Sequence, residues 1–261
     1  MGTPQKAYKN LEFLNSPEAR IIRILAEYLE PKKRFELQQI SNTIVFFGSS
    51  RLRSPEEIKD KLSKNLSDQE RKKYQMLEQL AHYYSEAKEL AYRLTKWNLQ
   101  QSASSYAICS GGGPGIMEAA NRGAREAGGK SVGLGISLPD LREPLNPYIT
   151  DELNFEFHYF FMRKFWFVYL AKALVVFPGG FGTLDELFEI LTLIQTKKIK
   201  KNLPIVIYGK DYWQNVINFE YLSTHHFIEN EDNDLYFLAD TVDEAFQYIT
   251  DRLNQSQHNS R

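Results

Sequence analysis

The feature that most constrains this chain is a glycine-rich junction between an apolar run and an amphipathic run. The apolar run is Ala173-Leu174-Val175-Val176-Phe177, and Pro-Gly-Gly-Phe-Gly-Thr-Leu-Asp-Glu follows at residues 178–186. An amphipathic run then extends from Leu184 to Ile194. We therefore expect a buried strand that turns directly into a helix. The free N–H groups at a helix start favour an anion, phosphate above all, and glycines let that anion approach the backbone.

Apolar and amphipathic runs alternate along the rest of the chain. Strands are predicted at residues 43–47, 106–109, 131–136, 173–177, 204–208 and 235–238. Helices are predicted at residues 17–29, 68–98, 115–127, 157–171, 184–197, from about 211, and 241–253, the last capped by Thr241 with Glu244 three residues later. This alternation predicts an α/β fold with a mostly parallel sheet and helices on both faces. No Pro/Gly/Ser-rich linker divides the chain, which favours one domain.

Three turns that carry glycine or serine follow predicted strands, at residues 48–51, 111–115 and 179–183. In open parallel sheets, ligands bind beyond the carboxyl ends of the strands, where the strand order reverses. We therefore expect the three turns to converge on one ligand site.

Composition narrows the class of protein. With 32 Lys+Arg against 33 Asp+Glu, the chain lacks the basic excess expected of a nucleic-acid binder. The single cysteine, Cys109, rules out a disulfide framework and is predicted to be a buried structural thiol. No apolar segment has the ~18 residues of a membrane span, and no hydrophobic signal core follows the N-terminus, so we expect a cytoplasmic protein that does not bind membranes.

Several familiar motifs fail on spacing. The turn at 111–115 is not a dinucleotide fingerprint, because the third glycine of Gly-x-Gly-x-x-Gly would fall at Ile116. The stretch Gly128-Gly129-Lys130-Ser131 resembles the end of a phosphate-binding Walker loop, but residue 124 is alanine and a helix precedes it. No two histidines have the spacing of a helical zinc site, so we expect no bound metal.

Glu186 allows two interpretations. Thr183 and Glu186 fit a capping box, in which Glu186 would reach back to the Thr183 N–H. Alternatively, Glu186 is a carboxylate at the mouth of a phosphate-binding turn, placed to stabilise positive charge or to orient a water. Met162-Arg163-Lys164 also allows two interpretations: surface cations whose stems cover apolar neighbours, or an arginine fork that faces an anion.

Taken together, these stretches resemble the "Lonely guy" proteins, nucleoside 5′-monophosphate phosphoribohydrolases of the cytokinin-activating type that are often labelled lysine decarboxylases. The resemblance rests on residues 178–186, Met162-Arg163-Lys164, the Gly48-Ser49-Ser50 turn and the stretch 111–121, and covers about 43–210. It is closer to the larger bacterial purine/pyrimidine nucleotide nucleosidases than to the short plant-type enzymes.

The resemblance implies a Rossmann-like, doubly wound fold and a homodimer or a multiple of it. It implies hydrolysis of the N-glycosidic bond of a nucleoside monophosphate, such as AMP or a cytokinin riboside monophosphate, to base and ribose 5-phosphate without a cofactor. It makes Arg163 and Glu186 the catalytic pair, and assigns substrate binding to Ser49, Gly112, Gly113, Gly115, Lys164, Gly179, Gly180, Gly182 and Thr183. A non-catalytic nucleotide sensor or carrier, or a phosphotransferase, remains an alternative.

The chain departs from the short family members in two respects. The segment around Arg163 is unusually aromatic, which leaves the base preference open. We also predict a helical extension at residues 1–40, ahead of one catalytic domain at 41–254 and a polar tail at 255–261.

Overall fold

The computed structural model describes residues 4–101, 106–138 and 145–258. Its centre is a seven-stranded sheet in the order β4-β3-β2-β1-β5-β6-β7, in which every neighbouring pair is parallel. The strands are β1 (Asn42–Phe47), β2 (Tyr106–Ser110), β3 (Ser131–Ile136), β4 (Asn154–Phe157), β5 (Ala171–Val176), β6 (Ile205–Tyr208) and β7 (Phe237–Ala239). The predicted doubly wound, Rossmann-like α/β fold is confirmed.

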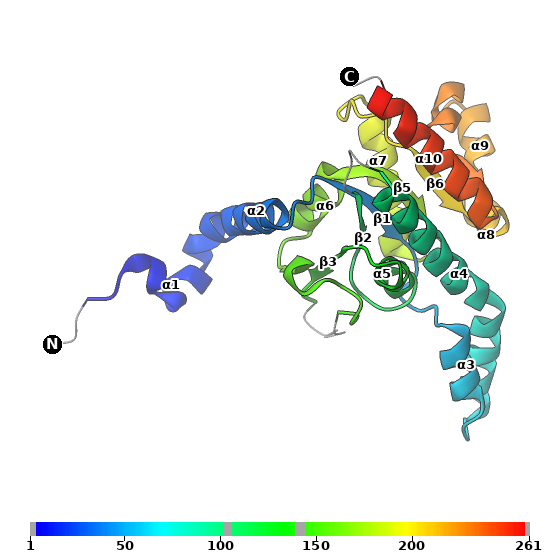
Figure 1. The fold of residues 1–261 in the computed structure, drawn as a ribbon, viewed down its shortest axis with the longest axis horizontal. Coiled ribbons are helices and arrows are strands. Elements are labelled where there is room, and N and C mark those ends of the chain that lie inside the picture. The colour runs from blue at the N-terminus through cyan, green and yellow to red at the C-terminus, as the bar shows by residue number, and fades with distance from the viewer. Residues whose placement is uncertain (1–3, 102–105, 139–144, 259–261) are drawn as a thin grey trace.

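The helices are α1 (Leu11–Asn15), α2 (Arg20–Leu37), α3 (Pro55–Leu62), α4 (Asp68–Leu99), α5 (Ile116–Glu126), α6 (Phe160–Tyr169), α7 (Phe181–Gln195), α8 (Lys210–Val216), α9 (Phe219–Thr224) and α10 (Val242–His258). Figure 1 shows α1 and α2 projecting from the body on the side opposite α3. The predicted capping box at the start of α10 is present, because Thr241 and Glu244 exchange hydrogen bonds.

Two hydrophobic cores sandwich the sheet because alternate residues of each strand point to opposite faces. In β1, Ile44 and Phe46 join the core built with α4, α5 and α10, whereas Val45 and Phe47 join the core built with α6 and α7. Cys109 is 1% exposed, as predicted, and burial raises the pKa of its thiol. A sheet covered on both faces leaves the carboxyl edge of the strands as the natural place for a ligand.

The structure corrects several predicted boundaries. The predicted helix at 157–171 begins only at Phe160, and Asn154–Phe157 forms β4, whose residues alternate between exposed and buried. That helix is not wholly buried, because Phe161 is 54% exposed. Helix α2 begins at Arg20 rather than 17 and runs to Leu37. Helix α10 continues to His258, into the predicted polar tail, whose residues 259–261 lie outside the described part.

Candidate active site

The strand order reverses between β1 and β5, so the chain leaves these neighbouring strands in opposite directions. The turn after β1 lies between the turns after β2 and β5. The Ser49 N–H donates to Pro178 O at 2.9 Å, and the Ile116 N–H donates to Ser49 O at 3.1 Å. The three turns therefore meet, as expected for a ligand site at a topological switch point.

Two of the glycines permit this close packing. A Cβ on Gly115, whose φ is +73°, would lie 2.3 Å from Ser49 O. A Cβ on Gly179 would lie 2.1 Å from Thr183 Oγ1 and 3.0 Å from Ser49 N. The distances to Ser49 O and to Thr183 Oγ1 are too short for any side chain, so both positions require glycine.

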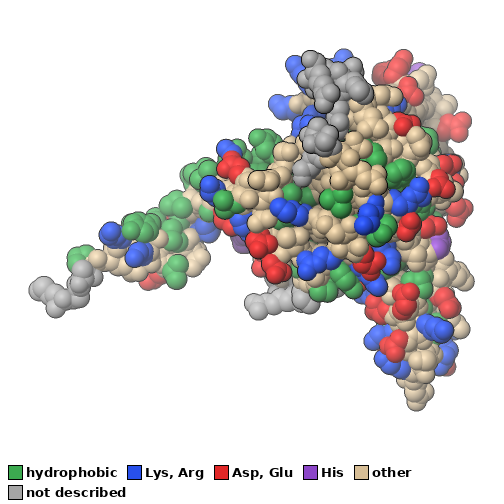
Figure 2. Space-filling view, viewed as in Figure 1, with side chains coloured by type: hydrophobic (Ala, Val, Ile, Leu, Met, Phe, Trp, Pro, Cys, Tyr) green, Lys and Arg blue, Asp and Glu red, His purple; other side chains and the backbone are tan. Residues whose placement is uncertain are grey.

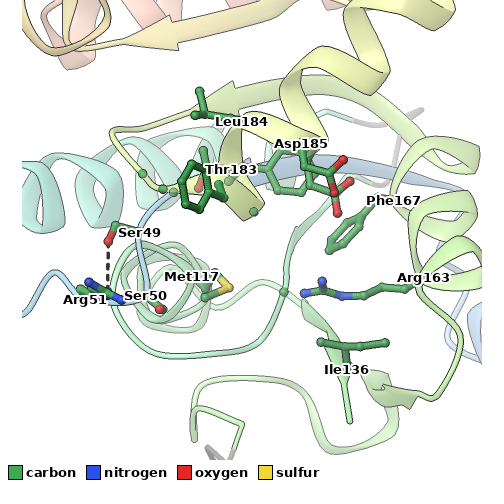
Figure 3. Close-up of a pocket in the computed structure, with 18 of the residues that line it drawn as sticks. Ser49, Ser50, Arg51, Met117, Ile136, Arg163, Phe167, Thr183, Leu184 and Asp185 are labelled. Atoms are coloured by element: carbon green, nitrogen blue, oxygen red, sulfur yellow. Dashed lines mark hydrogen bonds between the residues drawn. The ribbon is translucent and has the colours of Figure 1, made fainter. Parts of the chain in front are cut away.

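A cavity of about 640 Å³ opens beyond these turns. Figure 3 shows Ser49, Ser50 and Arg51 on one side of it and Arg163, Phe167 and Ile136 on the other. Seven of the predicted site residues line the cavity, namely Ser49, Arg163, Gly179, Gly180, Gly182, Thr183 and Glu186. It is thus polar and glycine-rich at one end and largely apolar at the other.

The capping-box interpretation of Glu186 is wrong. Helix α7 begins at Phe181 with Gly180 as its N-cap, and the Thr183 N–H donates to Gly180 O at 3.0 Å. Thr183 is therefore already inside the first turn, and Glu186 lies one turn further on. The Glu186 side chain is buried, 6% exposed, and no donor in the described part of the chain hydrogen-bonds to its Oε2.

The groups around Glu186 have opposite effects on its pKa. Burial raises the pKa of Glu186, because the charged form loses its hydration. Lys164 and Arg163 lower that pKa, and the neighbouring carboxylates of Glu189 and Asp185 raise it. Lys164 Nζ lies 3.4 Å from Glu186 Oε2. On balance the pKa of Glu186 is raised, as it is for carboxyl groups that exchange protons in active sites.

Arg163 reaches the cavity from α6. Its Nε donates to Leu134 O at 2.7 Å, and its guanidinium carbon lies 5.0 Å from the centre of the Phe167 ring. A Cβ on Gly111 would lie 2.5 Å from Arg163 Nη2, so the glycine makes room for the guanidinium. Burial lowers the pKa of Arg163, and Glu186 opposes this effect. The arginine therefore faces the cavity rather than solvent.

Lys164, which was predicted to bind substrate, lies beside the cavity and not in its lining. Its Nζ lies 2.9 Å from Asp185 Oδ2 and 2.6 Å from Glu189 Oε2. Adjacent residues on a helix point about 100° apart. Lys164 thus contacts the second and third turns of α7, while Arg163 enters the cavity.

Gly112, Gly113 and Gly115 also do not line the cavity. Asn146 Nδ2 donates to the carbonyl oxygens of Gly112 at 2.9 Å and Gly113 at 3.1 Å. These glycines shape the turn that supports Ser49, and the structure does not place them at the ligand surface.

Four polar residues that line the cavity were not among the predicted site residues, namely Ser50, Arg51, Asp185 and Tyr212. Ser50 and Arg51 belong to the predicted turn at residues 48–51, and Asp185 belongs to the junction at residues 178–186, so their positions could have been predicted. Tyr212 comes from α8, and its hydroxyl donates to Gly179 O. No local pattern links Tyr212 to Gly179, which is 33 residues earlier.

Among residues 4–101, 106–138 and 145–258, no three His, Cys, Asp or Glu side chains are grouped to hold a metal ion. Within the same ranges, no helix is both long enough and apolar enough to cross a membrane.

Comparison with known proteins identifies relatives. Residues 117–249, just over half of the chain, match the family model described as "Possible lysine decarboxylase". Pyrimidine/purine nucleotide 5′-monophosphate nucleosidases of Escherichia coli strains K12 and O157:H7 are each 32% identical over 113 residues. That match covers 39% of this chain and only 24% of each relative.

Among solved structures, the X-ray structure of TM1055, a structural genomics target, aligns over 80% of this chain and 99% of its own with a TM-score of 0.49 and 20% identity. The family match covers α5, α6 and α7 together with the cavity residues Arg163 and Glu186. The chain therefore belongs to the family described as possible lysine decarboxylases, to which the Lonely guy proteins also belong.

Proposed function

We propose that this protein hydrolyses the N-glycosidic bond of nucleoside 5′-monophosphates to a free base and ribose 5-phosphate. The observation that carries the proposal is Glu186, a buried carboxylate whose Oε2 accepts no hydrogen bond within the described chain. It lines the same cavity as a helix N-terminus and a partly buried arginine, Arg163. The curated relatives named as nucleotide 5′-monophosphate nucleosidases support the same reaction.

The glycine-rich end of the cavity suits the phosphate. The first N–H groups of α7 have no partner inside the helix, and the helix dipole favours an anion there. At Gly180 and Gly182 no atom lies within 4 Å of where a Cβ would be, which leaves open space beside the backbone. Ser49, Thr183 and Arg51 line the same end and add hydroxyl and guanidinium donors.

The opposite end suits the base. Figure 3 shows the apolar side chains of Ile136 and Phe167 there, beside Arg163. Flat aromatic bases pack well against such apolar surfaces. Since these side chains have no strong hydrogen-bonding groups, we expect contact and stacking to hold the base, with modest discrimination between purines and pyrimidines.

Between these ends, Glu186 and Arg163 perform the chemistry. As the C1′–N bond breaks, positive charge grows on the ribose, and the Glu186 carboxylate stabilises it. A water adds to C1′ and gives a proton to Glu186, while the base leaves with the electrons of the C1′–N bond and takes up a proton from solvent. Glu186 then releases its proton to solvent, which restores the carboxylate. Arg163 faces the base end, where its N–H groups stabilise the negative charge that develops on the departing base.

Lys164 acts through Glu186 as a positioning residue. Its Nζ bridges three carboxylates on α7, those of Asp185, Glu186 and Glu189. It keeps a positive charge behind Glu186 and opposes the effect of burial on that carboxyl group.

The residues of the cavity do not fit the reaction in the family's description. Lysine decarboxylation uses a pyridoxal Schiff base, which needs a lysine amine in the site. No lysine is among the described residues that line the cavity. Lys164, from the neighbouring position on α6, is instead engaged by three carboxylates.

A direct assay tests the proposal. The purified protein is incubated separately with AMP, GMP, CMP and a cytokinin riboside monophosphate, and the products are separated by chromatography. We expect free base and ribose 5-phosphate in equal amounts. Nucleotide binding without base release would overturn the enzyme assignment and favour a nucleotide sensor or carrier.

A further inference from the structure

Helix α6, which carries Arg163, is anchored at its start by a residue of the N-terminal helix α2. Among the described residues, the N-cap of α6, Tyr159, makes no capping hydrogen bond with its side chain, and the first turn of α6 holds no acidic residue. Glu27 of α2 lies there instead: its Oε1 accepts from the His158 N–H at 2.7 Å and its Oε2 accepts from the Tyr159 N–H at 3.3 Å. A carboxylate at a helix start satisfies free N–H groups and interacts favourably with the helix dipole.

The same residue also holds the second turn of α6. The Trp166 Nε1–H donates to the main-chain oxygen of Glu27 at 2.9 Å, and the Tyr28 ring stacks on the Trp166 ring with centres 5.8 Å apart. Figure 1 shows α2 meeting the body beside α6, and Figure 2 shows the outer part of this arm, with hydrophobic side chains along it, standing clear of the body. Hydrogen bonds of Glu27 therefore join the inner part of α2 to both the start and the second turn of α6.

Arg163 lies between these two anchor points. Its N–H donates at 3.1 Å to the carbonyl oxygen of Tyr159, the residue whose N–H Glu27 binds. Its guanidinium occupies a narrow slot, since Nε donates to Leu134 O at 2.7 Å and a Cβ on Gly111 would lie only 2.5 Å from Nη2. A displacement of α6 by about 1 Å would break the bond to Leu134 O or press the guanidinium against Gly111, and misplacements of that size can cost about 10²-fold in rate.

We propose that Glu27 is a positioning residue for Arg163, which makes helix α2 part of the framework of the catalytic site. The carboxylate and the main-chain oxygen of Glu27 hold α6 at the height at which the Arg163 guanidinium fits its slot. The catalytic consequence rests on the proposed function, in which Arg163 stabilises the departing base. The position of Arg163 depends on no reaction, so it can be measured separately.

Nuclear magnetic resonance of the nitrogen-15 labelled protein, without nucleotide, tests the positioning. The Nε–H of Arg163 is bonded to Leu134 O and should exchange slowly with water, and Arg163→Lys identifies its signal by removing it. Glu27→Ala should shift this signal and speed its exchange about tenfold or more. Glu27→Gln keeps the side-chain volume and one acceptor oxygen, so its exchange rate should lie between those of Glu27→Ala and the wild type.

The matched control is Glu30→Ala. Glu30 lies on the same helix and pairs with Arg34, also of α2, at 2.6 Å, so its removal should leave the Arg163 signal unchanged. A signal that stays in place in both Glu27 variants, or that moves equally in Glu30→Ala, would overturn the proposal. Because Glu27→Gln is the milder change, the test survives if Glu27→Ala fails to fold.

A double-mutant cycle tests the catalytic consequence. With AMP, Glu27→Ala should lower kcat about tenfold to 10²-fold and leave KM within about twofold, since Arg163 acts on the departing base. In an Arg163→Met background the same change should cost less than about twofold, because the residue through which Glu27 acts is gone. An equal loss in both backgrounds would assign Glu27 a merely structural role and refute the proposal. If the wild type releases no base from any nucleotide, the proposed function fails, and the Arg163 signal still decides whether Glu27 positions Arg163.

Discussion

Replacing Lys164 by methionine tests how the site controls its carboxylate. Methionine keeps most of the length and apolar volume of the lysine stem but removes the charge 3.4 Å from Glu186 Oε2. Two unit charges at that distance attract by about 1 kcal/mol in water and about 5 kcal/mol at an effective dielectric constant of about 20. Because Lys164 is shared with Asp185 and Glu189, we take the lower part of that range, about 1.4 kcal/mol.

The direction in which the pKa of Glu186 changes in this variant follows from the surroundings of the carboxyl group. Burial raises its pKa and Lys164 opposes that effect, so the methionine variant raises the pKa further. In the proposed mechanism the ionised carboxylate is the active form. A change of about 1.4 kcal/mol makes the ionised fraction of Glu186 about tenfold smaller in the variant at pH values below the pKa. The acid limb of kcat/KM against pH should therefore move to higher pH, measured from initial rates of base release.

Two further variants separate charge from packing. Lys164→Arg keeps a cation and should hold the acid limb near its wild-type position. Lys88→Met removes a lysine that bridges to Glu126 at 3.2 Å, away from the cavity, and should leave the limb unchanged. A Lys164→Met enzyme that loses kcat while its acid limb stays in place would refute the electrostatic reasoning and leave Lys164 with a packing role.

The remaining predictions concern the carboxylate and the glycine turns. Glu186→Gln should lower base release about 10²–10⁴-fold while circular dichroism and the melting temperature stay near wild type, and near-normal turnover would contradict a catalytic role. Gly115→Ala should lower the free energy of unfolding by well over 1 kcal/mol in urea denaturation, because its φ is +73° and the added Cβ would meet Ser49 O at 2.3 Å. Gly128→Ala, with φ +85° and no atom within 4 Å, is its control and should show only the smaller backbone cost. Gly182→Ala should preserve stability but raise KM for the nucleotide, since the methyl group occupies open space beside the α7 N-terminus; an unchanged KM would argue against phosphate at that position.

Local pattern was sufficient for most of the sheet. The apolar runs at 43–47, 106–109 and 173–177 became β1, β2 and β5 with boundaries shifted by at most two residues. Buried parallel strands read as continuous apolar segments, and the glycine turns behind them mark the strand ends. Strand β4 was not predicted, because it has only four residues and directly precedes an aromatic helix. Buried aromatic residues occur in strands and helices alike.

The local sequence pattern gave a wrong prediction for the start of α7. Thr183 and Glu186 have the spacing of a capping box, yet α7 begins at Phe181 because the chain leaves β5 through an extended Gly180. Similarly, Arg163 and Lys164 are adjacent cations on an aromatic helix. Only the packing of α6 against the sheet decides that Arg163 enters the cavity and that Lys164 contacts α7.

By itself, the sequence determined the α/β class, the parallel sheet and the glycine turns at the strand ends, because period, apolar runs and backbone freedom are local properties. Three features depend on which elements pack together: the convergence of those turns, the burial of Glu186 and the contact of Tyr212 with Gly179. These features were decided only by the tertiary structure, because contacts between residues distant in the chain set the direction, burial and electrostatic surroundings of each side chain.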